Sequence, residues 1–468
     1  MHTSTTSTVD LQPWTALQLA EATGGYWLNQ KIPEGDIKRI LTDSRHAEKA
    51  DAFLALQGER FDAHDFIAQV ALQGCEIAIV SRPIEAEICQ LVVQDTRLAL
   101  GHLGAYRRAQ NPQLKVIALT GSSGKTTTKE MLGSILSRLA PTLITRGNLN
   151  NDLGVPMMLL ELRAEHQYAV MELGASHQGE IDYTSNLVQP DVAGIINIGT
   201  AHLGEFGGRD GICRAKSEIY AHIAVTGTSI VPAADDFIDT IRQSVQTAQV
   251  LSFGESGDIF ATEIALHPQS STFSLNTPQG VCTVNLPFAG EHNVQNATAA
   301  AAFALAIGIT LDDIKIGLEQ ATGAKGRLNF IAVKNHVLID DTYNANPTSM
   351  RAAADVLAQQ QGVKVMVMGD IGELGATAAQ QHYMLGRDLV AKAVHFVVAV
   401  GEFAPAIQEG ARSTQYGKKM QAFLTQEQAL PFLVSLIATH QPQSMSFLFK
   451  GSRYTHMETL MADLMEKI

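Results

Sequence analysis

The chain is organised around residues 115–130, Lys115-Val-Ile-Ala-Leu-Thr-Gly-Ser-Ser-Gly-Lys-Thr-Thr-Thr-Lys-Glu130. The aliphatic and β-branched first half of this stretch predicts a short buried strand, and its second half predicts a glycine loop that opens a helix over residues 127–139. Backbone N–H groups of such a loop, the positive end of the helix and a lysine ammonium together bind phosphate. The residues expected to form this cradle, with the hydroxyl of Thr126 on a Mg²⁺ ion, are Gly121, Ser122, Ser123, Gly124, Lys125, Thr126 and Thr127.

The loop departs from the general phosphate-binding pattern at one position. That pattern has a glycine five residues before Gly124, where this chain has Leu119, so the loop is a shortened version. The alternative is an ordinary turn between a strand and a helix, but Gly-Lys-Thr in this context favours phosphate binding.

Composition narrows the class of protein. The chain has 468 residues, of which 46% are hydrophobic and 17% charged, so we expect a folded protein of about three domains. Its net charge is −13 and no basic block stands out, which argues against a nucleic-acid partner. The four cysteines are scattered, the N-terminus is polar, and no apolar stretch is long enough to span a bilayer. We therefore expect a cytoplasmic protein with reduced thiols and no membrane insertion.

The first expected domain covers residues 1–112 and is a small α/β unit that ends at Asn111-Pro112. Asp43-Ser44-Arg45 could be a solvated turn, or Arg45 with His64 nearby could bind a phosphate. The residues alone leave both readings open.

The second expected domain, residues 113–328, has predicted strands that end in Lys125-Thr126, Glu172 and His202. Ligands of an open parallel sheet lie outside the carboxyl ends of its strands, so these side chains should lie together and could bind Mg²⁺. Taken alone, Glu172 could instead accept backbone hydrogen bonds, and His202 could be an ordinary satisfied histidine. Lys216 reads as a solvated helix lysine.

Amide side chains recur in this domain. Asn148 and Asn151 lie in a loop that could orient a substrate or merely cap its own backbone. Asn296 could read the edge of a nucleotide base or be a helical polar residue without such a role. Residues 229–288 are rich in predicted strands and suggest an antiparallel segment added to the parallel sheet.

The third expected domain, residues 329–468, alternates strands and helices, which predicts a second, Rossmann-like parallel sheet. Polar groups again follow strands: Asp341, Asp370 with Glu373, and Lys450 with Arg453. The absence of G-x-G-x-x-G argues against a dinucleotide, so this domain is expected to present a substrate to the phosphate end of the central domain.

With these stretches in view, the chain resembles the Mur ligases over nearly its whole length. The matching motifs are Thr120-Gly-Ser-Ser-Gly-Lys-Thr126, Gly147-Asn-Leu-Asn-Asn151, Glu172-Leu-Gly174, Ala215-Lys216, His292-Asn-Val-Gln-Asn296, Asp341-Thr-Tyr-Asn-Ala-Asn-Pro347 and Gly369-Asp-Ile-Gly-Glu-Leu-Gly375. The shortened glycine loop is itself a feature of this family.

The resemblance implies an enzyme that uses ATP to join D-alanyl-D-alanine to a UDP-N-acetylmuramoyl tripeptide through an acyl phosphate. It further implies a monomer, two Mg²⁺ ions, a catalytic role for Lys125 and His202, and a carbamylated, catalytic Lys216, which reverses the reading of Lys216 given above. Thr126, Glu172, His202 and Lys216 would serve the metal sites, and Asn296, Arg327 and Asp341 would contact ATP. The residues expected at the substrates are Asp43, Ser44, Arg45, His64, Asn148, Asn151, Tyr343, Asn344 and Asn346.

Two alternatives stay open on the sequence. One is a sister ligase of the same family or folylpolyglutamate synthase, which shares the shortened loop. The other is a phosphate-loop switch that hydrolyses nucleotide without joining two substrates.

Overall fold

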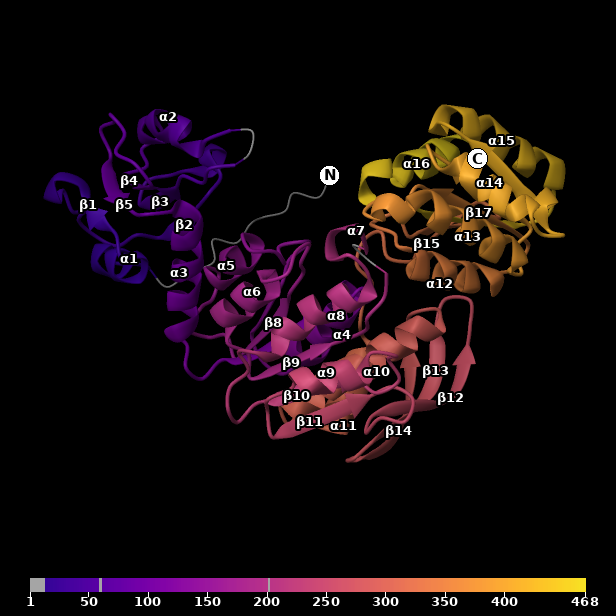
Figure 1. Cartoon of the computed structure of the whole chain (residues 1–468), viewed down its shortest axis with the longest axis horizontal. Coiled ribbons are helices and arrows are strands. Elements are labelled where there is room, and N and C mark those ends of the chain that lie inside the picture. The colour runs from indigo at the N-terminus through magenta and orange to yellow at the C-terminus, as the bar shows by residue number, and fades with distance from the viewer. Residues whose placement is uncertain (1–12, 59–60, 201–202) are drawn as a thin grey trace. The chain divides into compact units, whose positions relative to one another are not determined.

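The computed structural model describes residues 13–58, 61–200 and 203–468 (Figure 1). The chain divides into two compact units, and each is described here by itself. The first contains Met1–Ala118, Ala140–Gly174 and Asp182–Pro190, and the second contains Leu119–Leu139, Ala175–Ile181 and Asp191–Ile468. Among the described residues, no helix has both the length and the apolar character needed to cross a membrane.

The N-terminal part of the first unit is a five-stranded sheet in the order β1-β5-β4-β3-β2, parallel except for the β1–β5 pair. Alternate residues of the buried strands face opposite sides of this sheet. One side packs on α1 and α3, and the other packs on α2. The elements are α1 (Ala16–Thr23), β1 (Tyr26–Trp27), η1 (Leu28–Gln30), β2 (Arg39–Leu41), η2 (Ser44–His46), β3 (Asp51–Leu54), η3 (Ala63–Phe66), α2 (Ile67–Leu72), β4 (Ile77–Val80), β5 (Cys89–Val92) and α3 (Thr96–Ala109).

The central part of the chain forms a six-stranded sheet in the order β11-β10-β9-β6-β8-β7. Its elements are β6 (Lys115–Thr120), α4 (Lys125–Ser137), β7 (Thr142–Ile144), α5 (Gly154–Leu159), β8 (Tyr168–Glu172), α6 (Glu180–Val188), β9 (Val192–Ile195), α7 (Leu203–Phe206), α8 (Arg209–Ser217), η4 (Glu218–Tyr220), β10 (Thr228–Pro232), α9 (Ile238–Ser244), β11 (Gln249–Phe253), β12 (Phe260–Leu266), β13 (Ser271–Thr277), β14 (Gly280–Leu286), α10 (Glu291–Ala306) and α11 (Leu311–Glu319).

The expected antiparallel strands of this region are present, but they do not all join the large sheet. β12, β13 and β14 form an antiparallel sheet of their own, whereas β10 and β11 pair in parallel and extend the large sheet. A strand-rich composition does not distinguish these two pairings, because the partner of each strand depends on the connections around it.

The C-terminal part of the second unit is a six-stranded sheet in the order β15-β16-β20-β17-β18-β19, parallel except for the β15–β16 hairpin. Helices α12, α13 and α14 cover one face and α15 and α16 cover the other. Figure 1 shows α12 and α15 on opposite sides of this sheet. The elements are β15 (Asn329–Val333), β16 (His336–Asp340), α12 (Pro347–Ala358), β17 (Val363–Gly369), η5 (Gly375–Thr377), α13 (Ala378–Ala391), β18 (Phe396–Val400), α14 (Ala404–Arg412), η6 (Gly417–Lys419), β19 (Met420–Phe423), α15 (Gln426–His440), β20 (Met445–Lys450), η7 (Arg453–Thr455) and α16 (Met457–Lys467).

This sheet confirms the α/β class. Its strands are continuous apolar runs because both faces are covered by helices. Parallel order also places the ends of β16, β17 and β20 at one edge, and it is there that Asp341, Asp370 and Lys450 occur.

Candidate active site

The glycine loop connects β6 to α4 and has the geometry of a phosphate cradle. Gly124 is the N-cap of α4 with φ of 77°, so the helix begins at Lys125, two residues earlier than the sequence suggested. A Cβ atom on Gly124 would lie 2.2 Å from Oδ1 of Asn296. Glycine is therefore required at this position for two reasons, the left-handed backbone and the close approach of α10.

Lys125 lies over the loop, and Thr126 and Thr127 lie with it in the first turn of α4. The Lys125 Nζ atom donates a hydrogen bond to the Gly121 carbonyl oxygen at 2.8 Å. The ammonium and the positive end of the α4 dipole thus stand at the same loop, the combination that stabilises an anion.

Asn197, two residues after β9, holds the loop and was not among the predicted site residues. Its Oδ1 accepts the Ser123 N–H at 3.0 Å, and its Nδ2 donates to the Ser123 carbonyl at 3.0 Å. The Ser122 N–H also donates to the Asn197 carbonyl at 3.1 Å. A signal was present in the sequence, because Asn197 is a polar residue near the carboxyl end of a strand, as Glu172 is.

Three hydroxyl oxygens in and around the loop are buried without a hydrogen-bond partner among the described residues. They belong to Thr120, Ser122 and Thr128. An unpaired buried hydroxyl costs about 1–3 kcal/mol, and such groups call for a physical explanation. Ser122 lies within the loop itself, where a ligand oxygen would satisfy its hydroxyl.

Asn296, on the first turns of α10, packs against the loop. Its Nδ2 donates to Oδ1 of Asn293 at 3.1 Å, and Asn293 in turn donates to the Ala289 carbonyl at 2.8 Å. This chain of amides orients Oδ1 of Asn296 toward Gly124. Asn296 therefore has a structural role at the loop, whatever its contact with a nucleotide.

Glu172 is the last residue of β8, in the first unit, and only 2% of it is exposed. Its Oε1 accepts a hydrogen bond from Asn150 Nδ2 at 2.8 Å, while no described residue hydrogen-bonds its Oε2. A buried carboxylate with one unsatisfied oxygen fits the oxygen-ligand preference of Mg²⁺. Asn150, which was not predicted as a site residue, orients this carboxylate.

The two predicted amides next to Asn150 are both exposed. Asn151 Oδ1 accepts the Gly154 N–H at 2.8 Å, at the start of α5. The loop therefore caps its own backbone through Asn151 and orients Glu172 through Asn150.

Lys216 lies on α8 and only 2% of it is exposed. The residue-level reading of a solvated helix lysine is therefore wrong. The sequence of α8 is polar enough to suggest a surface helix, but its inward face contains this lysine beside Ile212 and Ala215. A buried lysine needs compensating negative charge or a change of charge state.

His202, the remaining predicted metal ligand, lies outside the described residues. Across the parts of the chain that the structure describes, no group of three or more His, Cys, Asp or Glu side chains could hold a metal ion. A Mg²⁺ site built from one carboxylate, one hydroxyl and nucleotide phosphates does not require such a group.

In the N-terminal region, Asp43 accepts hydrogen bonds from the Arg45 guanidinium at 2.8 and 2.6 Å. The Arg45 bonds hold the pKa of the Asp43 carboxyl well below its usual range. Ser44 lies between them in η2. Arg45 is exposed, so an anionic ligand could still reach its remaining N–H groups.

His64 is buried, and both of its ring nitrogens are engaged by the protein. Nδ1 lies 2.5 Å from Oδ1 of Asp62, and Nε2 accepts the Ser81 N–H at 2.9 Å. With both nitrogens occupied, His64 orients the loop around it, and a direct hydrogen bond to a ligand would require one of these contacts to break.

At the carboxyl edge of the C-terminal sheet, the Lys450 Nζ atom pairs with Asp341 at 2.7 Å and donates to the Asn344 carbonyl at 3.0 Å. Burial lowers the pKa of Lys450, while the Asp341 carboxylate opposes that shift. Nearby, the Arg327 guanidinium lies 4.3 Å from the centre of the Tyr343 ring, and no described residue bonds its Nε atom. The Nε–H group of Arg327 could therefore donate a hydrogen bond to a ligand beside the Tyr343 ring.

Asn346 connects the start of α12 to the glycine loop. Its Oδ1 accepts the Ser349 N–H at 2.8 Å as the N-cap of α12, and its Nδ2 donates to Ser123 Oγ at 3.1 Å. The sequence placed Asn346 near a substrate and gave no sign that it reaches the glycine loop.

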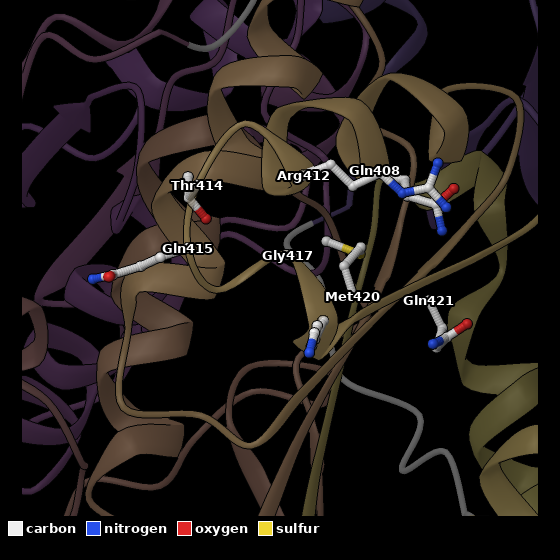
Figure 2. A pocket seen from close by; sticks show the side chains of 8 residues that line it. Gln408, Arg412, Thr414, Gln415, Gly417, Met420 and Gln421 are labelled. Atoms are coloured by element: carbon white, nitrogen blue, oxygen red, sulfur yellow. The ribbon is translucent and has the colours of Figure 1, made fainter.

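A separate concave surface lies at the amino edge of the C-terminal sheet, where α14 ends and β19 begins. Figure 2 shows its lining residues, which include Arg412 and no acidic side chain, around a cavity of about 520 Å³. Ligands of open α/β sheets bind at the carboxyl edge, so this cavity is not the predicted substrate site.

The glycine loop between β6 and α4 is the feature that defines a phosphate-loop nucleotide-binding protein. Comparison with family models identifies the family. Residues 119–304 match the Mur ligase middle domain, and residues 326–453 match the Mur ligase, glutamate ligase domain. The chain belongs to the Mur ligase family.

Individual relatives agree with this assignment. The chain is 42% identical to UDP-N-acetylmuramoyl-tripeptide–D-alanyl-D-alanine ligase of Escherichia coli (strain K12) over 445 residues, 94% of this chain and 96% of that protein. A crystal structure of MurF from Acinetobacter baumannii has 74% identity and a TM-score of 0.96, with coverage of 98% and 100%. MurF ligase from Thermotoga maritima in complex with ADP has 26% identity and a TM-score of 0.81, with coverage of 92% and 98%.

Proposed function

We propose that this protein is an ADP-forming ligase that joins D-alanyl-D-alanine to the UDP-N-acetylmuramoyl tripeptide, a step of peptidoglycan precursor synthesis. Relatives that span more than nine-tenths of the chain carry this activity in their name, and one of the similar structures is a complex with ADP. The glycine loop, with Lys125 over it and α10 packed against Gly124, is the observation that carries the proposal.

The loop residues 121–127 would bind the nucleotide phosphates. Lys125 would leave the Gly121 carbonyl for the outer phosphates, and the free hydroxyl of Ser122 would accept or donate a bond there. Magnesium, when bound, neutralises charge on the phosphoryl group. Thr126 and Oε2 of Glu172 would hold it, and a second ion would lie near His202 and a carbamylated Lys216. Carbamylation would turn the ammonium of Lys216, which is 2% exposed, into an anion that could bind a cation.

The remaining predicted residues would orient the reactants. Asn296, Arg327 and Asp341 would contact ATP, with Arg327 kept in place by the ring of Tyr343. Asp43, Ser44, Arg45 and His64 would serve the UDP end of the tripeptide substrate, and Asn148 and Asn151 would lie along it. Tyr343, Asn344 and Asn346 would line the place of the incoming dipeptide.

In the proposed reaction the free carboxylate of the tripeptide attacks the terminal phosphorus of ATP, and ADP leaves. The amine of D-alanyl-D-alanine then attacks the acyl phosphate, and phosphate leaves from the tetrahedral intermediate. Lys125 stabilises charge on the transferred phosphoryl group, and a site closed to water protects the acyl phosphate from hydrolysis. We assign residues 1–112 to the UDP end, 113–328 to ATP and 329–468 to the dipeptide, in a monomeric cytoplasmic enzyme.

A coupled ADP-release assay tests the proposal. ADP should appear only when both the UDP-muramoyl tripeptide and D-alanyl-D-alanine are supplied. Steady hydrolysis without an acceptor would instead favour a nucleotide switch, and turnover with another amino acid would favour a sister ligase. Lys125→Met should lower kcat by about a hundredfold or more while the protein remains folded, since it removes the charge and keeps the length of the side chain.

Lys216 can be tested in the same assay. Lys216→Ala should abolish turnover, and removal of bicarbonate should slow the wild-type enzyme. Activity that is independent of bicarbonate would contradict the carbamate.

A further inference from the structure

Two side-chain amides hold the Ser122–Ser123 segment of the glycine loop from different parts of the second unit. Asn197 bonds Ser123 from the end of β9, as described above. Asn346 bonds the same segment from the start of α12: its Nδ2 donates to Ser123 Oγ at 3.1 Å and to the Ser122 carbonyl at 3.4 Å. The loop that would bind phosphate is therefore joined directly to the C-terminal region.

The orientation of the Asn346 amide is fixed by its surroundings. Its Oδ1 accepts the Ser349 N–H, and its own backbone N–H donates the return bond to Ser349 Oγ at 3.0 Å, which completes a capping box. Turning the amide over would place its NH₂ against the Ser349 N–H and its oxygen against the Ser122 carbonyl, two repulsive contacts. One side chain thus caps a helix through its Oδ1 atom and bonds the loop through its Nδ2 atom.

The first turn of α12 makes a second contact with the central region. The Thr348 hydroxyl lies 3.4 Å from the Thr200 hydroxyl, beyond the end of β9. Asn346 is only 9% exposed, so water competes little for its hydrogen bonds. A shift of the loop on nucleotide binding must therefore either move α12 or break the Asn346 bonds.

We infer that Asn346 is a positioning residue that couples nucleotide binding at the glycine loop to dipeptide binding beside α12. The inference rests on the proposed function and adds to it the residue through which the two sites affect one another. Binding coupling is reciprocal, so a nucleotide that strengthens dipeptide binding is itself strengthened by the dipeptide to the same factor.

Asn346→Asp separates the two roles of the side chain. Aspartate is as good an N-cap as asparagine, so α12 keeps its cap, but the variant has no Nδ2 donor and sets a carboxylate against the Ser122 carbonyl. Ser349→Ala is the matched control. It removes the hydrogen bond from the Asn346 backbone N–H to Ser349 Oγ and leaves the bonds of Asn346 Nδ2 to the loop in place.

The measurement is the dissociation constant of D-alanyl-D-alanine by calorimetry, on enzyme saturated with the UDP-muramoyl tripeptide. It is made with and without a non-hydrolysable ATP analogue and Mg²⁺. The quantity compared is the ratio of the dissociation constant without nucleotide to that with nucleotide. We expect this ratio to be about five or more in the wild type and in Ser349→Ala. In Asn346→Asp the ratio should fall to within about twofold of one.

Ser123→Ala removes the same bond from the other side and should also lower the ratio. The double variant should show about the same ratio as Asn346→Asp alone, because that change already removes the bond that Ser123→Ala removes. If Asn346→Asp does not fold, as judged by its thermal unfolding, Ser123→Ala decides the question.

Three results would overturn the inference: a wild-type ratio near one, a wild-type ratio retained in the variants that lack the bond, or an equal loss in Ser349→Ala. A uniform loss of dipeptide affinity with and without nucleotide would make Asn346 a direct ligand instead. The proposed function is tested separately, by whether the wild-type enzyme releases ADP only with both substrates. Failure of the inference about Asn346 can therefore be told apart from failure of the proposed function.

Discussion

At the scale of single residues, Gly124 is the position where backbone and packing restrict the sequence most. Gly124→Ala would force an L-residue to φ of 77° and place its Cβ 2.2 Å from Oδ1 of Asn296. The left-handed backbone alone costs about 1–2 kcal/mol, and the collision must also move α10 or the loop. We expect ADP affinity to fall by about tenfold or more, as measured by calorimetry.

Gly308→Ala is the matched control for this prediction. Gly308 has φ of 84°, and a Cβ atom there would have no heavy atom within 4 Å, so its substitution adds backbone strain without a collision. Both variants should lose unfolding free energy, Gly124→Ala the more because of its collision with Asn296, and only Gly124→Ala should lose nucleotide affinity. Wild-type ADP affinity in Gly124→Ala would show that the loop is not the phosphate site.

The local structure around Gly124 and Lys125 was predictable from the sequence, because a strand, a glycine turn and a helix start are neighbours in the chain. Their contacts with phosphate stay predictions. The contact of His64 with Ser81 was not predictable, since only the folded structure brings Ser81 to its second nitrogen. The burial of Lys216 and the reach of Asn346 to Ser123 likewise depend on elements that are distant in sequence.

At the scale of elements, the end of β9 and the glycine loop act as one unit through Asn197. Asn197→Asp keeps the acceptor for the Ser123 N–H, but it removes the donor to the Ser123 carbonyl and sets a carboxylate beside that oxygen. We expect about tenfold weaker ADP binding, since a bond is replaced by repulsion near an anion site. Thermal unfolding should remain cooperative.

Asn335→Asp provides the comparison, because Asn335 is an exposed amide in the turn of the β15–β16 hairpin and donates to the Pro442 carbonyl at 3.4 Å. The same chemical change there should leave ADP binding unaltered. Equal affinities for both variants would contradict the role given to Asn197.

The elements themselves were largely predictable, and their pairings were less so. The alternation of strands and helices after residue 329 predicts a parallel sheet, which is observed. The same rules could not assign β10 and β11 to the large sheet and β12–β14 to a separate one, because composition does not specify which strand pairs with which. The order of strands is decided by packing across long sequence separations.

At the scale of the whole molecule, buried histidines make stability depend on pH. Burial is the main cause of the lowered pKa of a set of histidines, which includes His166, His292, His336 and His382. For His292 burial lowers the pKa to about 4. The unfolded chain then binds more protons than the folded one below about pH 6.5, so stability is full above that pH and is lost as the pH falls toward 4.

Urea unfolding at pH 7.5 and pH 5 measures this dependence. We expect a smaller free energy of unfolding at the lower pH, to which His292 contributes at most about 2 kcal/mol between these two pH values. His292→Gln should narrow the difference between the two pH values, whereas His177→Gln, at an exposed site beside Glu180, should not. An unchanged difference in His292→Gln would mean that this histidine is not held neutral by the fold.

The central claim is that the terminal phosphoryl group of ATP is transferred to the carboxylate of the peptide substrate before the amide bond forms. The direct measurement supplies UDP-muramoyl tripeptide labelled with ¹⁸O in that carboxylate, together with ATP and D-alanyl-D-alanine, and analyses the released phosphate by mass spectrometry. We expect each phosphate to carry a single ¹⁸O atom taken from the substrate, with the other label retained in the new amide. Unlabelled phosphate would show instead that ATP is hydrolysed by water and that no acyl phosphate forms.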